Sequence, residues 1–212
     1  MSPRLIDYGL RSCVLAVVAC GLAACGGARI GVQSGADINA AFPEDARSRY
    51  ARALGLMDAG KDARAVEQFE LIIEQYPDYA GPYLNIGIIH GRNARPDAAM
   101  LVLQRAAEVC SGCAATYNQL GIEHRRQGQF EEAEKAYLSA IDANGDYALA
   151  YFNLGVLYDL YLGRPDLALQ YYEGYQSRRR PSAVEQKDVV DTWIIDLRRR
   201  VGKPQQAAKV QP

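Results

Sequence analysis

The sequence predicts an all-α fold in which helix pairs of equal length stack side by side as a solenoid. Three glycines recur at a fixed spacing of 34 residues, at Gly87, Gly121 and Gly155. Each follows a similar phrase that begins with tyrosine: Tyr-Leu-Asn-Ile, Tyr-Asn-Gln-Leu and Tyr-Phe-Asn-Leu. An internal repeat of this length is typical of stacked helical hairpins, because each unit buries its apolar face against the next one.

The second half of each unit keeps the same spacing. An alanine follows the first two glycines by 12 residues, at Ala99 and Ala133, and a bulky residue comes four positions later, at Leu103 and Tyr137. Small side chains at a helix crossing let the two axes approach closely. The pattern resembles the tetratricopeptide repeat (TPR), which implies two antiparallel helices in each unit and a superhelical arrangement of the units.

The resemblance implies four repeats and a capping helix. The expected segments are repeats at 46–79, 80–113, 114–147 and 148–181, a capping helix over 182–201 and a disordered tail over 202–212. The first repeat is eroded, since Ala53 replaces its glycine, and terminal repeats of solenoids are often atypical. The fourth repeat fits only with one residue inserted around 160–162, which places Ala168 and Tyr172 in the alanine and aromatic positions.

The expected capping helix has one apolar face. Its apolar side chains recur at helical spacing and are Val190, Trp193, Ile194, Leu197 and Val201. The preceding residues 182–185 have the pattern of a capping box. We expect the apolar face to cover the open side of the fourth repeat, with Trp193 buried there rather than exposed as an anchor for a partner.

The first 24 residues predict a signal peptide rather than part of the fold. Two arginines precede an apolar stretch over residues 12–22, which is too short to span a bilayer as a mature helix. Leu-Ala-Ala-Cys-Gly at residues 22–26 resembles a bacterial lipobox, which implies cleavage before Cys25 and lipidation of its thiol. Ordinary secretory cleavage after Ala24, and a weaker lipobox at Cys20, are the alternatives.

A lipid anchor at Cys25 would be followed by a tether. Residues 25–45 are rich in glycine and alanine, a composition typical of flexible linkers. Several acyl chains on one cysteine would anchor the chain durably. Gly26 occupies the place at which aspartate retains Gram-negative lipoproteins at the inner membrane, so the resemblance implies an outer-membrane protein that faces the periplasm.

Charge is distributed unevenly along the chain. Residues 25–175 carry 13 Lys and Arg against 20 Asp and Glu, whereas residues 176–212 carry nine against four. The arginine clusters at 178–180 and 198–200 lie at expected helix ends, where cations are favoured, so we expect no nucleic-acid partner. We find no sequence signal for a cofactor, a metal site or a small-molecule substrate, and we expect the chain not to be an enzyme.

One motif in the repeats has reactive side chains. Cys110-Ser111-Gly112-Cys113 falls at the turn between the second and third repeats. A structural disulfide is expected there in an oxidising periplasm, and the alternatives are reduced thiols, a redox function or half of a metal site. Two equivalent histidines, His90 and His124, are expected to pack between helices rather than to bind a metal.

The first helix of each pair lines the concave wall in TPR solenoids, so the resemblance places a partner-binding groove there. Amides two residues before each glycine would form a ladder for the backbone of an extended peptide: Asn85, Gln119 and Asn153, with Asn118 beside them. Apolar residues one place after each glycine position would form the floor: Leu54, Ile88, Ile122 and Val156. The alternative is that the amides only hydrate an unused wall.

These expectations favour a membrane-anchored scaffold for protein–protein interactions in cell-envelope assembly, such as that of a pilus or secretion complex. Its partners would bind through the groove or the tyrosine-rich fourth repeat, since tyrosine gives a large contact area. A carboxylate clamp is not matched, because its positions carry Tyr50, Ala115 and Gln119. The alternatives are an accessory subunit of an ExbB/TonB-like complex, a thiol-disulfide protein acting through Cys110 and Cys113, and a structural homo-oligomer.

Overall fold

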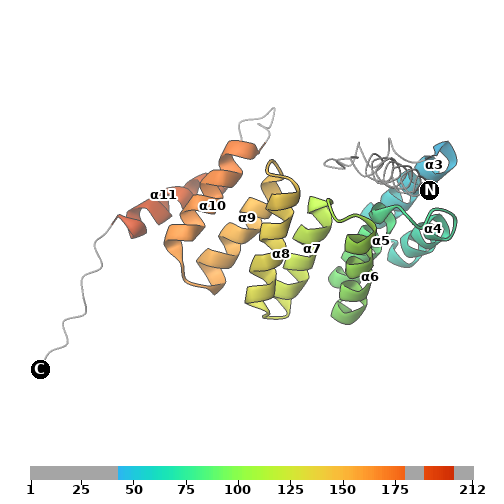
Figure 1. Cartoon of the computed structure of the whole chain (residues 1–212), viewed down its shortest axis with the longest axis horizontal. Coiled ribbons are helices and arrows are strands. Elements are labelled where there is room, and N and C mark those ends of the chain that lie inside the picture. Colours follow the sequence, from blue (N-terminus) through green and yellow to red (C-terminus); the bar gives the residue numbers. More distant parts are fainter. Residues whose placement is uncertain (1–42, 180–188, 203–212) are drawn as a thin grey trace, which may run out of the picture.

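The computed structural model describes residues 43–179 and 189–202, and the regular structure in these ranges is helical (Figure 1). The elements in chain order are α3 (Glu44–Asp58), α4 (Asp62–Gln75), α5 (Ala80–Arg92), α6 (Pro96–Val109), α7 (Ala114–Arg126), α8 (Phe130–Ala143), α9 (Ala148–Val156), η1 (Leu157–Tyr161), α10 (Pro165–Arg178) and α11 (Val189–Val201). The all-α class predicted from the sequence is confirmed. No helix in the described ranges has the length and apolar character needed to cross a membrane.

Several expected features lie outside the described residues. They are the signal peptide, Cys25, nearly all of the 25–45 tether, the capping box at 182–185 and the tail after residue 202.

The helices form pairs that stack along the long axis of the molecule (Figure 1). Each first helix packs on the second helix of its own pair, as α3 on α4, α5 on α6, α7 on α8 and α9 on α10. First helices of neighbouring pairs also contact each other, α5 with α7 and α7 with α9. Because elements on the inside of a curved stack are the closest together, the first helices form the inner wall of the solenoid.

Each repeat glycine receives a bulky side chain from the second helix of its own pair. A Cβ atom added to the glycine would lie only 2.5–2.6 Å from that side chain in the pairs Gly87–Leu103, Gly121–Tyr137 and Gly155–Tyr172. No ordinary Cβ contact is so short, so these crossings require glycine. In the first pair, Ala53 and Phe69 take the equivalent places and are fully buried.

One turn of π-helix absorbs the residue inserted in the fourth repeat. Helix α9 runs directly into η1, and the Leu162 N–H donates to the Leu157 carbonyl, five residues back. This wider turn adds a residue without ending the helix. Ala168 and Tyr172 therefore return to buried positions, as the sequence predicts.

Helix α11 covers the open side of α10. Val190, Ile194 and Leu197 are buried in one apolar cluster with the fourth repeat. Trp193 is half-buried, and its ring stacks on Phe152 with 6.2 Å between the centroids. The expectation for Val201 was wrong: this side chain is 43% exposed, because it is the last residue of α11 and no further turn follows.

Candidate protein-interaction surface

The amide of Asn85 on the inner wall is buried and bonded within the chain. It donates one hydrogen bond to the Tyr50 hydroxyl on α3, at 2.7 Å, and a second to the Gly81 carbonyl on its own helix, at 2.9 Å. The bond to Tyr50 joins the first helices of two neighbouring repeats. Both N–H groups of this amide are therefore committed, and neither can pair with the backbone of a partner.

A similar hydrogen bond joins the first helices of the third and fourth repeats. Asn153 on α9 donates to the side-chain oxygen of Asn118 on α7 at 2.9 Å, and both residues are buried. Gln119, which the 34-residue spacing aligns with Asn85 and Asn153, instead donates to Glu123 on its own helix at 2.9 Å. The expectation of an open amide ladder was therefore wrong. Asn85 and Asn153 form hydrogen bonds to the first helix of the preceding repeat, and Gln119 forms one within its own helix.

A buried carboxylate, which the sequence analysis missed, braces α5 against α7. Glu123 is only 1% exposed. Its carboxylate accepts from Gln119 and from the half-exposed Arg126 at 2.7 Å. It lies against Gly91 of α5, where any side chain would collide with it. The sequence signal was Gly91 itself, a second glycine one helical turn after Gly87.

The residues predicted to form the floor of the groove are half-buried apolar side chains on the first helices. Leu54, Ile88, Ile122 and Val156 are each half-buried against the cores of their repeats. Leu149, which the sequence analysis did not single out, is 51% exposed. It lies seven residues before Val156 and so on the same face of α9. The wall therefore offers an apolar strip whose partly exposed side chains can contact a protein partner.

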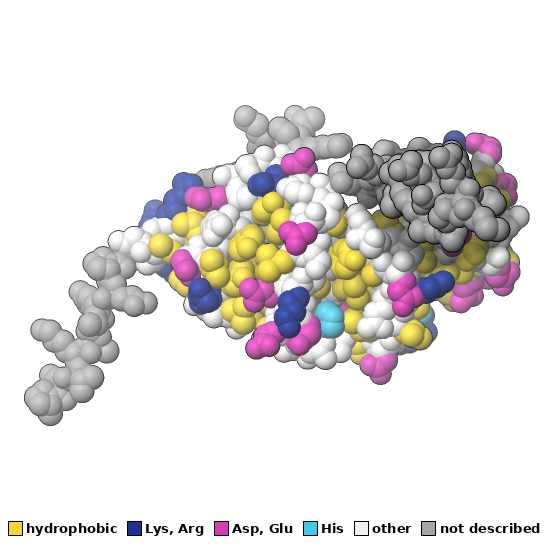
Figure 2. All heavy atoms as spheres, in the orientation of Figure 1, with side chains coloured by type: hydrophobic (Ala, Val, Ile, Leu, Met, Phe, Trp, Pro, Cys, Tyr) yellow, Lys and Arg dark blue, Asp and Glu magenta, His cyan; other side chains and the backbone are white. Residues whose placement is uncertain are grey.

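Hydrophobic side chains also gather in patches across the face drawn in Figure 2, between charged side chains. The larger apolar side chains exposed on the described residues include Leu101 (70%), Leu160 (69%) and Tyr161 (47%). Leu101 lies on the second helix α6, away from the first-helix wall. It therefore provides a natural comparison for Leu149.

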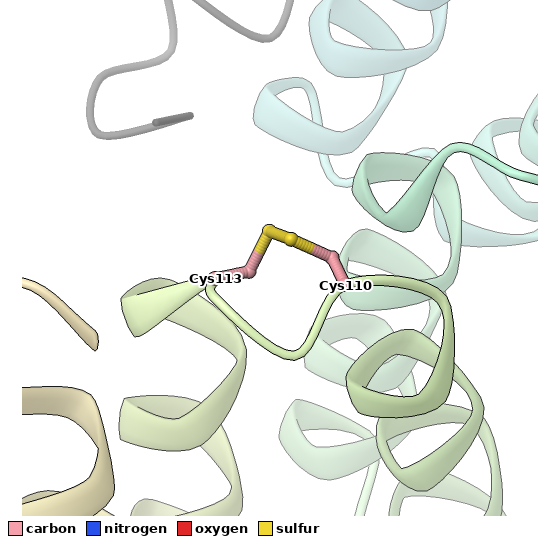
Figure 3. The surroundings of a disulfide bond; sticks show 2 residues. All are labelled: Cys110 and Cys113. Atoms are coloured by element: carbon pink, nitrogen blue, oxygen red, sulfur yellow. A yellow bond between two sulfur atoms is a disulfide. The ribbon is translucent and has the colours of Figure 1, made fainter. Parts of the chain in front are cut away.

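Cys110 and Cys113 form a disulfide that closes the turn between α6 and α7 (Figure 3). Cys113 directly precedes α7 and is buried, and Cys110 directly follows α6. In this form neither sulfur is a thiol, so neither can attack a substrate. The bond ties the second repeat to the third.

The two equivalent histidines have different surroundings. His90 is half-buried on α5; burial, followed by the charge of Arg95, lowers the pKa of its imidazole. His124 lies with Nδ1 2.7 Å from the Gln129 side-chain oxygen. Over residues 43–179 and 189–202 no three His, Cys, Asp or Glu side chains come together as a possible metal site.

The fourth repeat uses several of its tyrosines for its own packing. Tyr158 donates to Glu134 and stacks on Tyr171 with 5.5 Å between ring centroids. Tyr172 is buried over Gly155. Tyr161, at the end of η1, is the exception with nearly half of its surface exposed.

Comparison with known proteins agrees with this geometry. Two family models described as tetratricopeptide repeat match residues 45–79 and 118–184. The chain therefore contains tetratricopeptide repeats, a class that acts typically as a non-catalytic scaffold and binds protein partners along its groove. Small glutamine-rich tetratricopeptide repeat-containing protein 2 of Saccharomyces cerevisiae is 31% identical over 114 residues, which make up 50% of this chain and 33% of that protein. The chain thus matches about a third of the length of this curated relative.

Solved structures with the same fold include bacterial proteins. The structure of pilF from Pseudomonas aeruginosa matches with a TM-score of 0.65 at 20% identity, over 75% of this chain and 70% of that one. TTC0263, a TPR protein of Thermus thermophilus, matches with a TM-score of 0.58 at 24% identity, over 76% and 81%. MamA matches with a TM-score of 0.56 at 23% identity, over 71% and 84%. At these identities the matches establish the TPR superhelix and no more.

Proposed function

We propose that this chain is a membrane-anchored scaffold that holds an extended segment of a cell-envelope protein along its inner wall. The observation that carries the proposal is the apolar strip on the first helices, formed by Leu54, Ile88, Ile122 and Val156 together with Leu149. Solenoid stacking leaves such a strip uncovered, because each repeat contacts only its neighbours. Binding a partner removes this partly exposed apolar surface from water.

The hydrogen bonds of the inner-wall asparagines indicate how a partner would be held. Since Asn85 and Asn153 are bonded between helices, they fix the curvature of the wall rather than grip the partner. The partner is therefore held chiefly by apolar contacts to the strip. A substitution of these asparagines would disturb the scaffold itself and is a poor test of binding.

A sharper test replaces Leu149 with lysine. Leu149 is half exposed, so the variant should fold normally while placing a charge in the strip. Crosslinking in cells followed by purification of this chain should recover less of its envelope partner from the Leu149→Lys variant than from wild type. The matched control is Leu101→Lys on the outer helix α6, which should leave recovery unchanged. Equal recovery from all three chains would remove the groove from the proposal.

The membrane anchor is a separate part of the proposal and rests on the lipobox around Cys25. Replacement of Cys25 by serine removes the thiol that would be acylated, so the chain should move from the membrane fraction to the soluble periplasmic fraction. Fractionation of cells that express each form measures this, with Cys20→Ser as the matched control. Membrane association that survives in Cys25→Ser but not in Cys20→Ser would assign the anchor to Cys20 instead.

The proposed placement at the outer membrane rests on the lipobox and on Gly26. The proposed role in assembling a pilus, secretion or similar complex rests on the resemblance to TPR lipoproteins. Separation of inner and outer membranes on a density gradient tests the placement. Recovery of the chain with the inner membrane would favour the alternative of an accessory subunit in an energised inner-membrane complex.

A further inference from the structure

A surface patch outside the apolar strip joins the exposed turn between the two helices of the fourth repeat to half-buried residues at the corresponding turn of the third repeat. We call this surface the π-turn patch, and its residues are Arg125, Phe130, Leu160 and Tyr161. Leu160 is 69% exposed and Tyr161 is 47% exposed. Tyr161 is the last residue of the π-helical turn η1.

Large apolar side chains at these positions are peculiar to the fourth repeat. The positions five and six residues after the repeat glycine, or after Ala53, hold Asp58 and Ala59 in the first repeat, Arg92 and Asn93 in the second, and Arg126 and Gln127 in the third. These are polar or small residues, as expected at a solvated turn. The fourth repeat has Leu160 and Tyr161 there, on a π-helical turn. Such turns occur frequently at functional sites.

Arg125 supplies a positive charge to the patch. Its guanidinium carbon lies 5.7 Å from the centroid of the Tyr161 ring, which in turn lies 5.2 Å from the centroid of Phe130. Among the described residues no carboxylate lies within ion-pair distance of Arg125. The nearby acid Glu123 is paired with Arg126, and Asp159 is paired with Arg200 at 2.6 Å.

A buried tyrosine hydroxyl on α8 has no hydrogen-bond partner among the described residues. The Tyr137 side chain is fully buried, and its hydroxyl makes no hydrogen bond to any described residue. Its ring lies over Gly121, which is one helical turn before Arg125 on the same face of α7. Burial raises the pKa of this hydroxyl to about 12, and the charge of Arg125 acts to lower it. The hydroxyl belongs to the core of the third repeat and is not part of the exposed patch.

We infer that the π-turn patch binds a protein segment in which an aspartate or glutamate lies beside an apolar residue. The partner's carboxylate pairs with Arg125, whose guanidinium lies over the Tyr161 ring. The neighbouring apolar side chain covers Leu160 and Tyr161. Charge complementarity selects an acidic segment, because Arg125 is a cation with no acid of its own. This inference rests on the proposed function, for which it names the chemistry of the partner at one edge of the inner wall.

Selection from a random twelve-residue peptide library displayed on phage tests the inference with the full chain in detergent. Peptides selected on wild type should be enriched in Asp or Glu next to an apolar residue. Arg125→Gln should lose the acidic enrichment while still selecting apolar peptides. The matched control is Arg64→Gln, which removes the same charge from an exposed site on the outer helix α4 and should keep the enrichment. Acidic enrichment that persists in Arg125→Gln, or none on wild type, would overturn the inference.

Binding of one selected acidic peptide then separates the contributions. Arg125→Gln should weaken its affinity about tenfold or more, since a charge-assisted hydrogen bond is lost. Tyr161→Asn introduces the residue found at the equivalent position of the second repeat, Asn93, and should weaken the affinity for the peptide several-fold.

The Leu149→Lys variant distinguishes failure of this inference from failure of the proposed function. If its peptides change while those of Arg125→Gln do not, the inner wall binds a partner and the π-turn patch does not. If neither substitution changes the selected peptides, or if no peptide is selected by wild type, both proposals fail.

Discussion

Asn153 donates a hydrogen bond to Asn118, although the 34-residue spacing aligns Asn153 with Gln119. The bond therefore joins two positions that are not equivalent in the third and fourth repeats. Asn85 and Tyr50 show the same relationship, since this pair also spans 35 residues. An inter-helix bond at the same place in two junctions fixes how one repeat sits on the next.

Replacing Asn153 with alanine should destabilise the chain by about 1–3 kcal/mol, because the buried Asn118 amide loses its partner. Unfolding in urea, followed by circular dichroism, measures the change. Gln104→Ala on the exposed side of α6 is the control and should cost little. A cost for Asn153→Ala no larger than that of the control would show that the pair does not hold the junction.

Replacing a glycine by alanine should change stability in opposite directions at Gly155 and at Gly55. Gly155→Ala should destabilise by about 1–3 kcal/mol, because its new Cβ would lie 2.6 Å from the buried Tyr172 ring, which has no room to retreat. Gly55 lies within α3 with no atom within 4 Å of such a Cβ. Gly55→Ala should therefore stabilise by about 0.5–1 kcal/mol through helix propensity. Thermal unfolding measures the change in stability of both variants. A shift of melting temperature with the same sign in the two would contradict the close packing of Tyr172 on Gly155.

The sequence was sufficient to predict the repeat and its register, because helix crossings demand small residues at fixed places. Gly87, Gly121 and Gly155 each lie where a larger side chain would collide with the second helix of the pair. Their spacing in the sequence therefore gives the spacing of the helix crossings. The inserted residue in the fourth repeat was visible for the same reason, since Ala168 and Tyr172 move by one place. The π-helical form of the insertion was not visible, because i→i+5 bonding leaves no pattern of its own in the sequence.

The state of the inner-wall amides could not be predicted in the same way. The sequence places Asn85 and Asn153 on first helices, yet their hydrogen-bond partners, Tyr50 and Asn118, stand at non-equivalent positions of the preceding repeats. Glu123 was missed for a similar reason, since its burial depends on Gly91 of another helix. Periodicity therefore predicts which face a residue is on, whereas packing between repeats decides whether its polar atoms are free.

The disulfide should act as a brace of modest strength. Replacing both Cys110 and Cys113 with serine should lower stability by about 2 kcal/mol, the chain-entropy value for so short a loop, and the melting temperature by about 4–8 °C. Reduction of the wild type with dithiothreitol should give a similar shift and leave the double variant unchanged. Catalysis of insulin reduction by wild type, absent in the double variant, would instead support the rival thiol-disulfide function.

The unpartnered Tyr137 hydroxyl predicts how stability changes in alkali. The ordinary tyrosine pKa is near 10, and burial raises that of Tyr137 to about 12. Because the folded pKa is the higher one, the stability linked to this hydroxyl is fully present below pH 10. It is lost as pH rises toward 12, where the unfolded chain ionises more readily. Tyr137→Phe removes this loss, at a slope of up to about 1.4 kcal/mol per pH unit.

The comparison that isolates this effect is the difference in unfolding free energy between wild type and Tyr137→Phe, measured at pH 8 and at pH 11. At pH 8 the variant should be as stable as wild type or more stable, because it no longer buries an unpaired hydroxyl. At pH 11 its advantage should be larger, since wild type alone must keep this group protonated. A variant that is less stable at pH 8 would mean that the hydroxyl already has a hydrogen-bond partner in the folded chain.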